Sequence, residues 1–68
     1  MYYIVTHKDI RSNPIGPIKY NLIGLRRRYS YNWRNIEDDV MKKLKNHGDK
    51  IKINYDFNTV LTIEAHDE

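Results

Sequence analysis

The fold is decided by one stretch, Asn35-Ile36-Glu37-Asp38-Asp39-Val40-Met41-Lys42-Lys43-Leu44-Lys45-Asn46-His47-Gly48. Asn35 can accept hydrogen bonds from the free amides at a helix start, and Gly48 can adopt the left-handed conformation that ends a helix. Acidic residues come first and basic residues last, which suits the helix dipole. The apolar positions recur every four residues at Ile36, Val40 and Leu44, with Trp33 and Met41 beside them. The stretch predicts an amphipathic helix whose apolar face must be covered.

The segments on either side of this helix predict strands. Residues 2–6 are aromatic or β-branched on both alternating faces, so we expect a strand inside the sheet. Residues 51–55 and 60–65 alternate apolar and polar side chains and predict a hairpin. A three-residue loop at Phe57-Asn58-Thr59 keeps the two faces of the hairpin separate. That register, or a bulged equivalent, pairs Ile53 with Ile63, Tyr55 with Leu61, Lys52 with Glu64, and Asn54 with Thr62.

The remaining part of the chain is less regular. Residues 8–17 contain two prolines and a glycine and predict a loop. Residues 18–23 alternate apolar and polar side chains, which favours a strand, although Ile18, Leu22 and Leu25 also fit one face of a helix. We expect a strand over residues 18–23 and a second extended piece over residues 26–31.

These elements predict an α+β fold for residues 1–68, as a small single domain. One helix packs on a mostly antiparallel sheet of three to four strands, in the order β-β-α-β-β. The apolar stripe of the helix is expected to pack against the inner face of the hairpin. An open edge strand would also permit a homodimer by strand pairing.

The composition limits the classes of protein. Sixty-eight residues leave little room for a deep catalytic cleft. Without cysteine the chain has no disulfide and no thiolate zinc site, and no stretch has the pattern of a signal peptide or a membrane span. We expect a cytoplasmic protein without a cofactor or a membrane partner. The abundance of Ile, Asn, Lys and Tyr is typical of A/T-rich genomes, and a phage source would place the protein in a host cytoplasm.

Positive charge and aromatic rings gather in the first half of the chain. Residues 1–34 have a net charge of +6 and hold five of the six tyrosines, whereas residues 35–68 have a net charge of −3. The densest segment carries four arginines and three rings in nine residues, Arg26-Arg27-Arg28-Tyr29-Ser30-Tyr31-Asn32-Trp33-Arg34. Guanidinium groups bind phosphates, and exposed rings stack on unpaired bases. The candidate binding residues are Arg26, Arg27, Arg28, Tyr29, Tyr31 and Arg34, whereas Trp33 falls on the helix stripe and is assigned to the core.

From this segment we expect a small basic, non-enzymatic protein that contacts RNA or single-stranded DNA. The alternative is a small regulator or inhibitor that binds an acidic surface of a host protein through the same face, because Arg, Tyr and Trp also dominate protein interfaces. A structural interpretation is that the rings pack in the core while the arginines form a solvated edge. Exposed rings would separate the nucleic-acid hypothesis from the structural one.

The histidines give less support to catalysis or metal binding. His7 and Asp9 would share one face of a strand, but two ligands do not make a metal site. His47 is better explained as a cation at the C-terminus of the helix. We therefore predict no catalytic residue and no metal ligand.

One short stretch is similar to part of a known family. Residues 17–24, Pro-Ile-Lys-Tyr-Asn-Leu-Ile-Gly, followed by Arg27 and Arg28, resemble the Lys-x-x-Leu-x-Gly turn of RelE/ParE-type toxins, which implies ribonuclease-like activity. That family has helices before the turn and strands directly after it. Here we expect a loop before it and a helix after it, so a binding protein remains the prediction.

Overall fold

In the computed structural model, which describes residues 1–67, four antiparallel strands form one sheet against which two α-helices pack. The strands are β1 (Tyr2–Asp9), β2 (Ile15–Tyr20), β3 (Lys50–Asn54) and β4 (Thr59–His66). The helical elements are α1 (Leu22–Arg28), the short 3₁₀ helix η1 (Ser30–Asn32) and α2 (Trp33–Lys43). The strand order in the sheet is β2-β1-β4-β3. The α+β class and the antiparallel sheet are confirmed, and α1 is a second helix beyond the one predicted.

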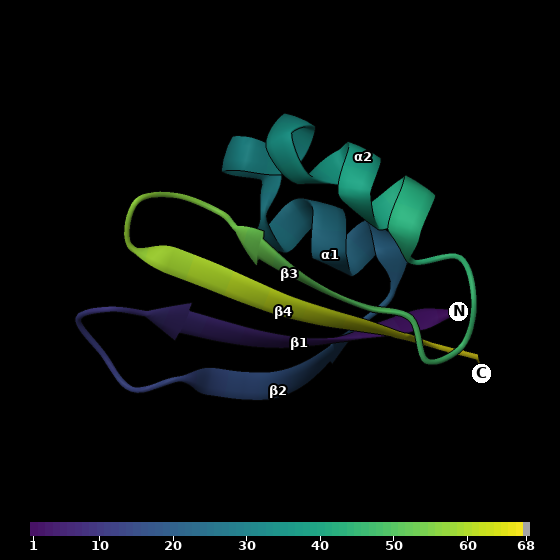
Figure 1. Ribbon diagram of the computed structural model, residues 1–68, viewed down its shortest axis with the longest axis horizontal. Helices are drawn as coiled ribbons and strands as arrows, with labels where there is room; N and C mark the ends of the chain where they lie inside the picture. The colour runs from purple at the N-terminus through teal and green to yellow at the C-terminus, as the bar shows by residue number, and fades with distance from the viewer. Residues whose placement is uncertain (68) are drawn as a thin grey trace.

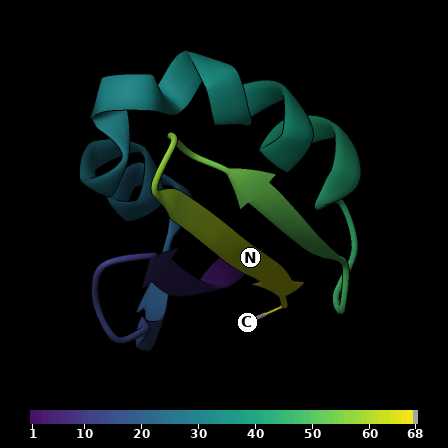
Figure 2. The ribbon, with the colours of Figure 1, turned by 60° about the vertical axis from the view of Figure 1, so that its left-hand side comes forward.

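Both helices cover the same side of the sheet, with α1 packed on β1 and β2 and α2 packed on β3 (Figures 1 and 2). The core lies between these two layers. Its buried side chains are Tyr3, Val5, Leu25, Tyr29, Trp33, Ile36, Val40, Leu44, Ile53, Leu61, Ile63 and Ala65. The predicted stripe of α2 is thus buried, together with Trp33, whereas Met41 is exposed.

The first strand lies inside the sheet, as its sequence predicted. β1 pairs with β2 on one side and with β4 on the other, and the pairing with β4 runs from Tyr2 opposite His66 to Asp9 opposite Thr59. Tyr3 and Val5 are buried beneath the helices, and Ile4 between them faces the opposite side of the sheet. The two edges of the sheet are therefore β2 and β3.

The main difference from the sequence prediction is α1, which occupies residues expected to be extended. Asn21 caps this helix, because its side-chain oxygen accepts a hydrogen bond from the Gly24 amide at 2.7 Å. Leu25 and Tyr29 are four residues apart and both reach the core. The arginines of the last turn suit the negative end of the helix dipole. Burial of this apolar pair therefore outweighs the alternating pattern.

The strand before α1 shifts for the same reason. The strand predicted over residues 18–23 is β2, which ends at Tyr20 because Asn21 starts the helix. The loop predicted over residues 8–17 is wrong at both ends, since β1 continues to Asp9 and β2 begins at Ile15. Pairing with β4 extends β1, and the edge position of β2 tolerates Pro17 in a strand.

The ends of α2 also differ from the prediction. The helix begins at Trp33, two residues before the predicted cap Asn35, and it ends at Lys43. Burial of Trp33 favours the earlier start, and its indole Nε1 donates a hydrogen bond to Glu37 Oε2 at 2.5 Å. Gly48 has a φ of 92°, but it lies in the turn before β3 rather than at the end of the helix.

The β3–β4 hairpin keeps its predicted faces in a different register. The observed pairs are Lys50 with Glu64, Ile51 with Ile63, Lys52 with Thr62, Ile53 with Leu61, and Asn54 with Val60. The loop is Asp56-Phe57-Asn58, because the Tyr55 amide donates to the Thr59 carbonyl at 2.9 Å. Asp56 Oδ1 closes this loop by accepting from the Asn58 amide at 2.8 Å. The predicted partners are thus wrong by two residues, a shift that leaves the apolar set inside because the side-chain period is two.

Two glycines make a matched test of the backbone. Gly16 has a φ of 106°, and a Cβ there would lie 2.7 Å from the Val5 carbonyl oxygen, whereas Gly48 has open space around it. We expect Gly48→Ala to lower the free energy of unfolding by about 1–2 kcal/mol, the cost of a left-handed backbone with a side chain. Gly16→Ala should cost at least about 1 kcal/mol more than that, because the new methyl group overlaps the carbonyl. Urea denaturation measures both values, and equal losses would contradict the role of the Val5 contact.

Candidate nucleic-acid interface

The four predicted arginines lie on the helical side of the molecule, where α1 leads into α2. Arg26, Arg27 and Arg28 form the last turn of α1, and Arg34 lies in the first turn of α2. All four side chains are exposed. Because this segment is helical, the alternating faces expected of an extended piece do not form, and the arginines spread around a helix.

Arg26 contacts α2 rather than solvent alone. Its Nη2 lies 3.5 Å from Glu37 Oε2, and its guanidinium carbon lies 5.8 Å from the centroid of the Trp33 ring. The same Glu37 oxygen accepts the indole hydrogen bond from Trp33. Arg26 therefore joins α1 to α2, and the nearby carboxylate partly neutralises its charge.

Tyr29 belongs to the core and offers no ring for stacking on a base. Its side chain is only 2% exposed, and Arg28 lies over its ring at 5.3 Å from the centroid. The ring meets Tyr20 and Tyr55 edge-on and stacks on His7. Burial raises the pKa of the Tyr29 hydroxyl from 10.0 to about 12, with a smaller contribution from Tyr20. The stacking role predicted for Tyr29 is therefore wrong, because its ring is buried.

Tyr31 is the exposed ring of the segment. Its side chain is 90% exposed in η1, whereas every other tyrosine is buried or half-buried. Arg34 follows three residues later, in the first turn of α2. Neither Arg27 nor Arg34 forms an ion pair with any residue in the range 1–67. The exposed members of the predicted set are therefore Tyr31 and the arginines.

An open depression lies beside η1 and was not predicted from the sequence. Its volume is about 580 Å³, and it is lined by Asn32, Asn35, Asn54, Tyr55, Asp56 and Phe57. Asn32 Nδ2 donates to the Tyr55 carbonyl at 3.1 Å, which joins η1 to the hairpin. Phe57 at the hairpin tip is fully exposed. In the sequence, the only feature that pointed to this depression was Phe57, an aromatic residue in a predicted loop.

The chemistry of the depression suits base edges better than phosphates. Side-chain amides donate and accept hydrogen bonds, as base edges do. The hydrogen bond from the Asn58 amide holds the pKa of the Asp56 carboxyl below its usual value, so this group is ionised at neutral pH. A carboxylate repels phosphate but can accept from the amino group of a base. The arginines and Tyr31 lie outside the set that lines the depression.

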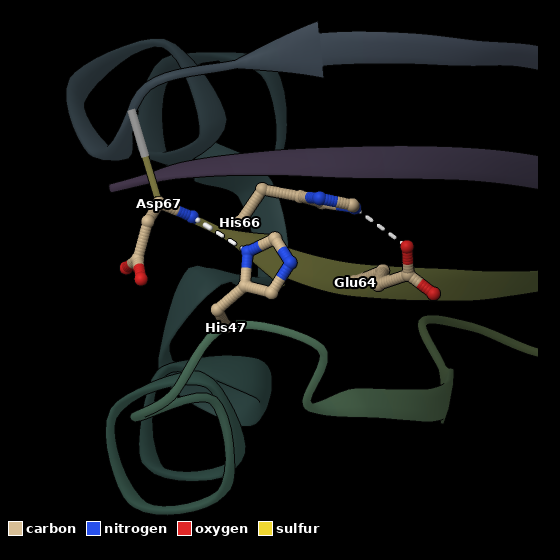
Figure 3. A network of polar contacts seen from close by, with 4 residues as sticks. All are labelled: His47, Glu64, His66 and Asp67. Carbon is tan, nitrogen blue, oxygen red and sulfur yellow. Dashed lines mark hydrogen bonds and ion pairs between the residues drawn. The ribbon is translucent and has the colours of Figure 1, made fainter.

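Two of the histidines meet at the opposite end of the hairpin (Figure 3). His47 Nδ1 accepts a hydrogen bond from the Asp67 amide at 3.1 Å, and His66 Nε2 lies 2.5 Å from Glu64 Oε1. The prediction that His47 acts as a cation at the helix C-terminus is wrong, because α2 ends at Lys43 and His47 lies four residues beyond it. Among residues 1–67, no group of three or more His, Asp or Glu side chains is placed to hold a metal ion.

No protein-family model, curated protein or solved structure matches this chain. No helix in the part of the chain that the structure describes is long and apolar enough to cross a membrane.

Proposed function

We propose that this protein binds RNA or single-stranded DNA, without catalysis, through the end of the molecule formed by η1 and the arginines. The observation that carries the proposal is Tyr31, whose ring is 90% exposed although the fold has an apolar core available. An exposed ring costs hydrophobic stabilisation, and stacking on an unpaired base recovers it. Arg34, three residues along the chain in the first turn of α2, supplies a guanidinium for the adjoining phosphate.

The flanking surface supports the same ligand. Phe57 is a second exposed ring, and it lines the depression together with Asn32, the residue that follows Tyr31. When one base of a nucleic acid stacks on Tyr31, the neighbouring bases can reach the side-chain amides that line the depression and form hydrogen bonds with them. Duplexes lack unstacked bases, so we propose a preference for single strands.

The Tyr31 ring should account for a large part of the affinity. We expect Tyr31→Ala to weaken binding of a labelled single-stranded 12-mer by about 1–3 kcal/mol, roughly 5- to 150-fold, because one base loses its stacking partner. Tyr31→Phe keeps the ring and should bind nearly as tightly as the wild-type protein. Fluorescence anisotropy at low salt measures these affinities, with a duplex of equal length as the weaker ligand.

Salt dependence tests the arginines in the same assay. Arg34→Ala should reduce the slope of log K against log salt by about 0.7, the value for one phosphate contact on a single strand. A control variant, Lys42→Gln, removes one positive charge from the far end of α2 and should change the slope little. If no oligonucleotide binds to the wild-type protein at low salt, the proposed function is wrong.

A protein partner is the second candidate. Leu22 and Ile23 at the start of α1 are exposed to 37% and 65%, next to the arginines that an acidic protein surface would attract. A regulator or inhibitor would use this mixed apolar and basic surface. The discriminating result is stoichiometric capture of one protein from a cell extract, abolished by Ile23→Asp, with no oligonucleotide binding. If Ile23→Asp leaves that capture unchanged, this candidate is wrong.

A further inference from the structure

Among residues 1–67, both helices lie on one side of the sheet, and no element covers the other side (Figures 1 and 2). The strand pairing decides which residues lie there, because directly opposite residues point to the same side. We call this surface the open face. It consists of Tyr2, Ile4, Thr6 and Lys8 from β1, Lys19 from β2, Lys50, Lys52 and Asn54 from β3, and Val60, Thr62, Glu64 and His66 from β4.

The open face is strongly basic. It carries four lysines, all exposed, against the single carboxylate of Glu64. Glu64 is engaged by His66, whose Nε2 lies 2.5 Å from its Oε1. None of the four lysines forms an ion pair with a residue of the described chain. On the helical side, by contrast, Asp39 pairs with Lys43 and Glu37 pairs with Arg26.

Three of the four lysines flank the centre of the open face, and Lys8 lies near the end of β1. Cross-strand pairing places Lys19 on the β2 side and Lys50 and Lys52 on the β3 side, with β1 and β4 between them. Three strand spacings separate the two sides, a distance of about 14 Å. The centre holds short half-buried side chains, namely Ile4, Thr6, Val60 and Thr62. A polyanion can therefore lie on the centre with ammonium groups along both margins.

The ring stack at one end holds part of this charge in place. Lys19 Nζ lies 4.2 Å from the centroid of the Tyr2 ring, which favours a fixed ammonium position. The Tyr2 ring stacks on His66 at 5.3 Å with an interplanar angle of 10°, and His66 meets His47 edge-on at 5.1 Å (Figure 3). Prior ordering of Lys19 lowers the entropy cost of binding an anion.

The open face is continuous with the proposed site. Asn54 belongs to the open face, where it pairs with Val60, and it also lines the depression beside η1. Lys50 and Lys52 lie on the same edge strand, four and two residues before Asn54. A single-stranded nucleic acid that runs from Tyr31 past the depression therefore reaches these lysines by passing around the edge strand β3.

We propose that the open face binds the phosphate backbone of the same single-stranded nucleic acid, so that the ligand passes around the β3 edge from the Tyr31 end. This inference rests on the proposed function and extends it to a second surface, with phosphate contacts from lysine. Charge complementarity selects a polyanion as the occupant, since the open face offers four cations and one engaged carboxylate.

The test uses the full chain and two matched double variants. Lys50→Gln/Lys52→Gln removes two charges from the open face, and Lys42→Gln/Lys45→Gln removes two charges from α2 and the segment after it. All four side chains are exposed, so both variants should fold, which circular dichroism checks. Titration of labelled single strands of increasing length, at several salt concentrations, gives affinity and salt slope.

We expect the open-face variant to lose at least tenfold in affinity for a 12-mer at low salt, and its salt slope to fall by about 0.7 for each lost phosphate contact. The loss should shrink with the shortest strands, which do not reach from Tyr31 to β3. The control variant should change affinity less than twofold. Lys8→Gln/Lys19→Gln should repeat the open-face result from the half of the face formed by β1 and β2.

Each alternative outcome is distinguishable. If wild-type protein binds no oligonucleotide, the proposed function and this inference both fail. If it binds but the open-face variants match the control, the inference alone fails. If the open-face variants lose binding while Tyr31→Ala does not, the lysines bind the ligand without Tyr31, and the proposed path around β3 from Tyr31 is overturned. If the lysines are needed for phosphatidylserine vesicles and not for oligonucleotides, the occupant is a membrane surface and the inference is overturned.

Discussion

Tyr29→Ala should lower the free energy of unfolding by about 3–5 kcal/mol, the usual cost of removing a buried aromatic ring. The ring is 2% exposed and contacts three other rings, with centroids at 5.3 Å for Tyr55, 6.0 Å for His7 and 6.3 Å for Tyr20. A domain of this size has a stability of only a few kcal/mol, so the variant should be largely unfolded. Urea denaturation followed by circular dichroism measures the loss.

Tyr29→Phe is the control for this variant. It keeps the ring and removes only the hydroxyl, whose contact with His7 Nδ1 is long at 3.4 Å. We expect it to change stability by about 1 kcal/mol or less. It should also leave oligonucleotide binding unchanged, because the ring is not at the surface. If the Tyr29→Ala protein kept wild-type stability but no longer bound oligonucleotides, Tyr29 would be a binding residue after all.

The second large effect concerns alkaline pH. Burial raises the pKa of Tyr29 to about 12 in the folded state, against 10.0 when unfolded. Between these pH values the folded state holds a proton that the unfolded state releases, so stability is full below pH 10.0 and falls as pH rises toward 12. The shift of about two units corresponds to a loss of about 3 kcal/mol at most.

Comparison with Tyr29→Phe isolates this titration from those of the other tyrosines and the lysines. We expect the stability of the wild-type protein to decline relative to the variant between about pH 10 and pH 12. Below pH 10 the difference between the two should be constant. Parallel stability curves across the whole range would contradict a raised pKa. Ultraviolet titration gives a second measurement, since the Tyr29 hydroxyl should ionise near pH 12 in the folded protein.

Much of the fold could be predicted because single segments carry their own periodicity. The stripe of Ile36, Val40 and Leu44 predicted α2, and alternation predicted the strands of the hairpin and their inner faces. α1 could not be predicted in this way, because Ile18, Leu22 and Leu25 fit both a strand and a helix. The choice depends on what covers Leu25. The helix α1 packs on β1 as well as on the adjacent β2, so the answer lies outside the local pattern of these residues.

The candidate site illustrates the same limit. An extended chain would place Tyr29 and Tyr31 on one face, whereas the helical path buries Tyr29 and Trp33 and exposes Tyr31 between them. The composition of residues 26–34 therefore predicted that the segment is basic, but it did not predict which of its rings faces solvent. The depression was beyond prediction, since it requires η1 to lie beside the loop of a hairpin more than twenty residues later.

The position of β1 beside β4 has a consequence for how the domain assembles. Each half of the chain supplies one two-stranded hairpin, and such hairpins are at best marginally stable alone. Only the pairing of Tyr2–Asp9 with Thr59–His66 completes the sheet, and it joins segments nearly a whole chain apart. Closing so long a loop is slow compared with forming a helix or a hairpin. Both halves should therefore acquire stable structure together, in one cooperative step.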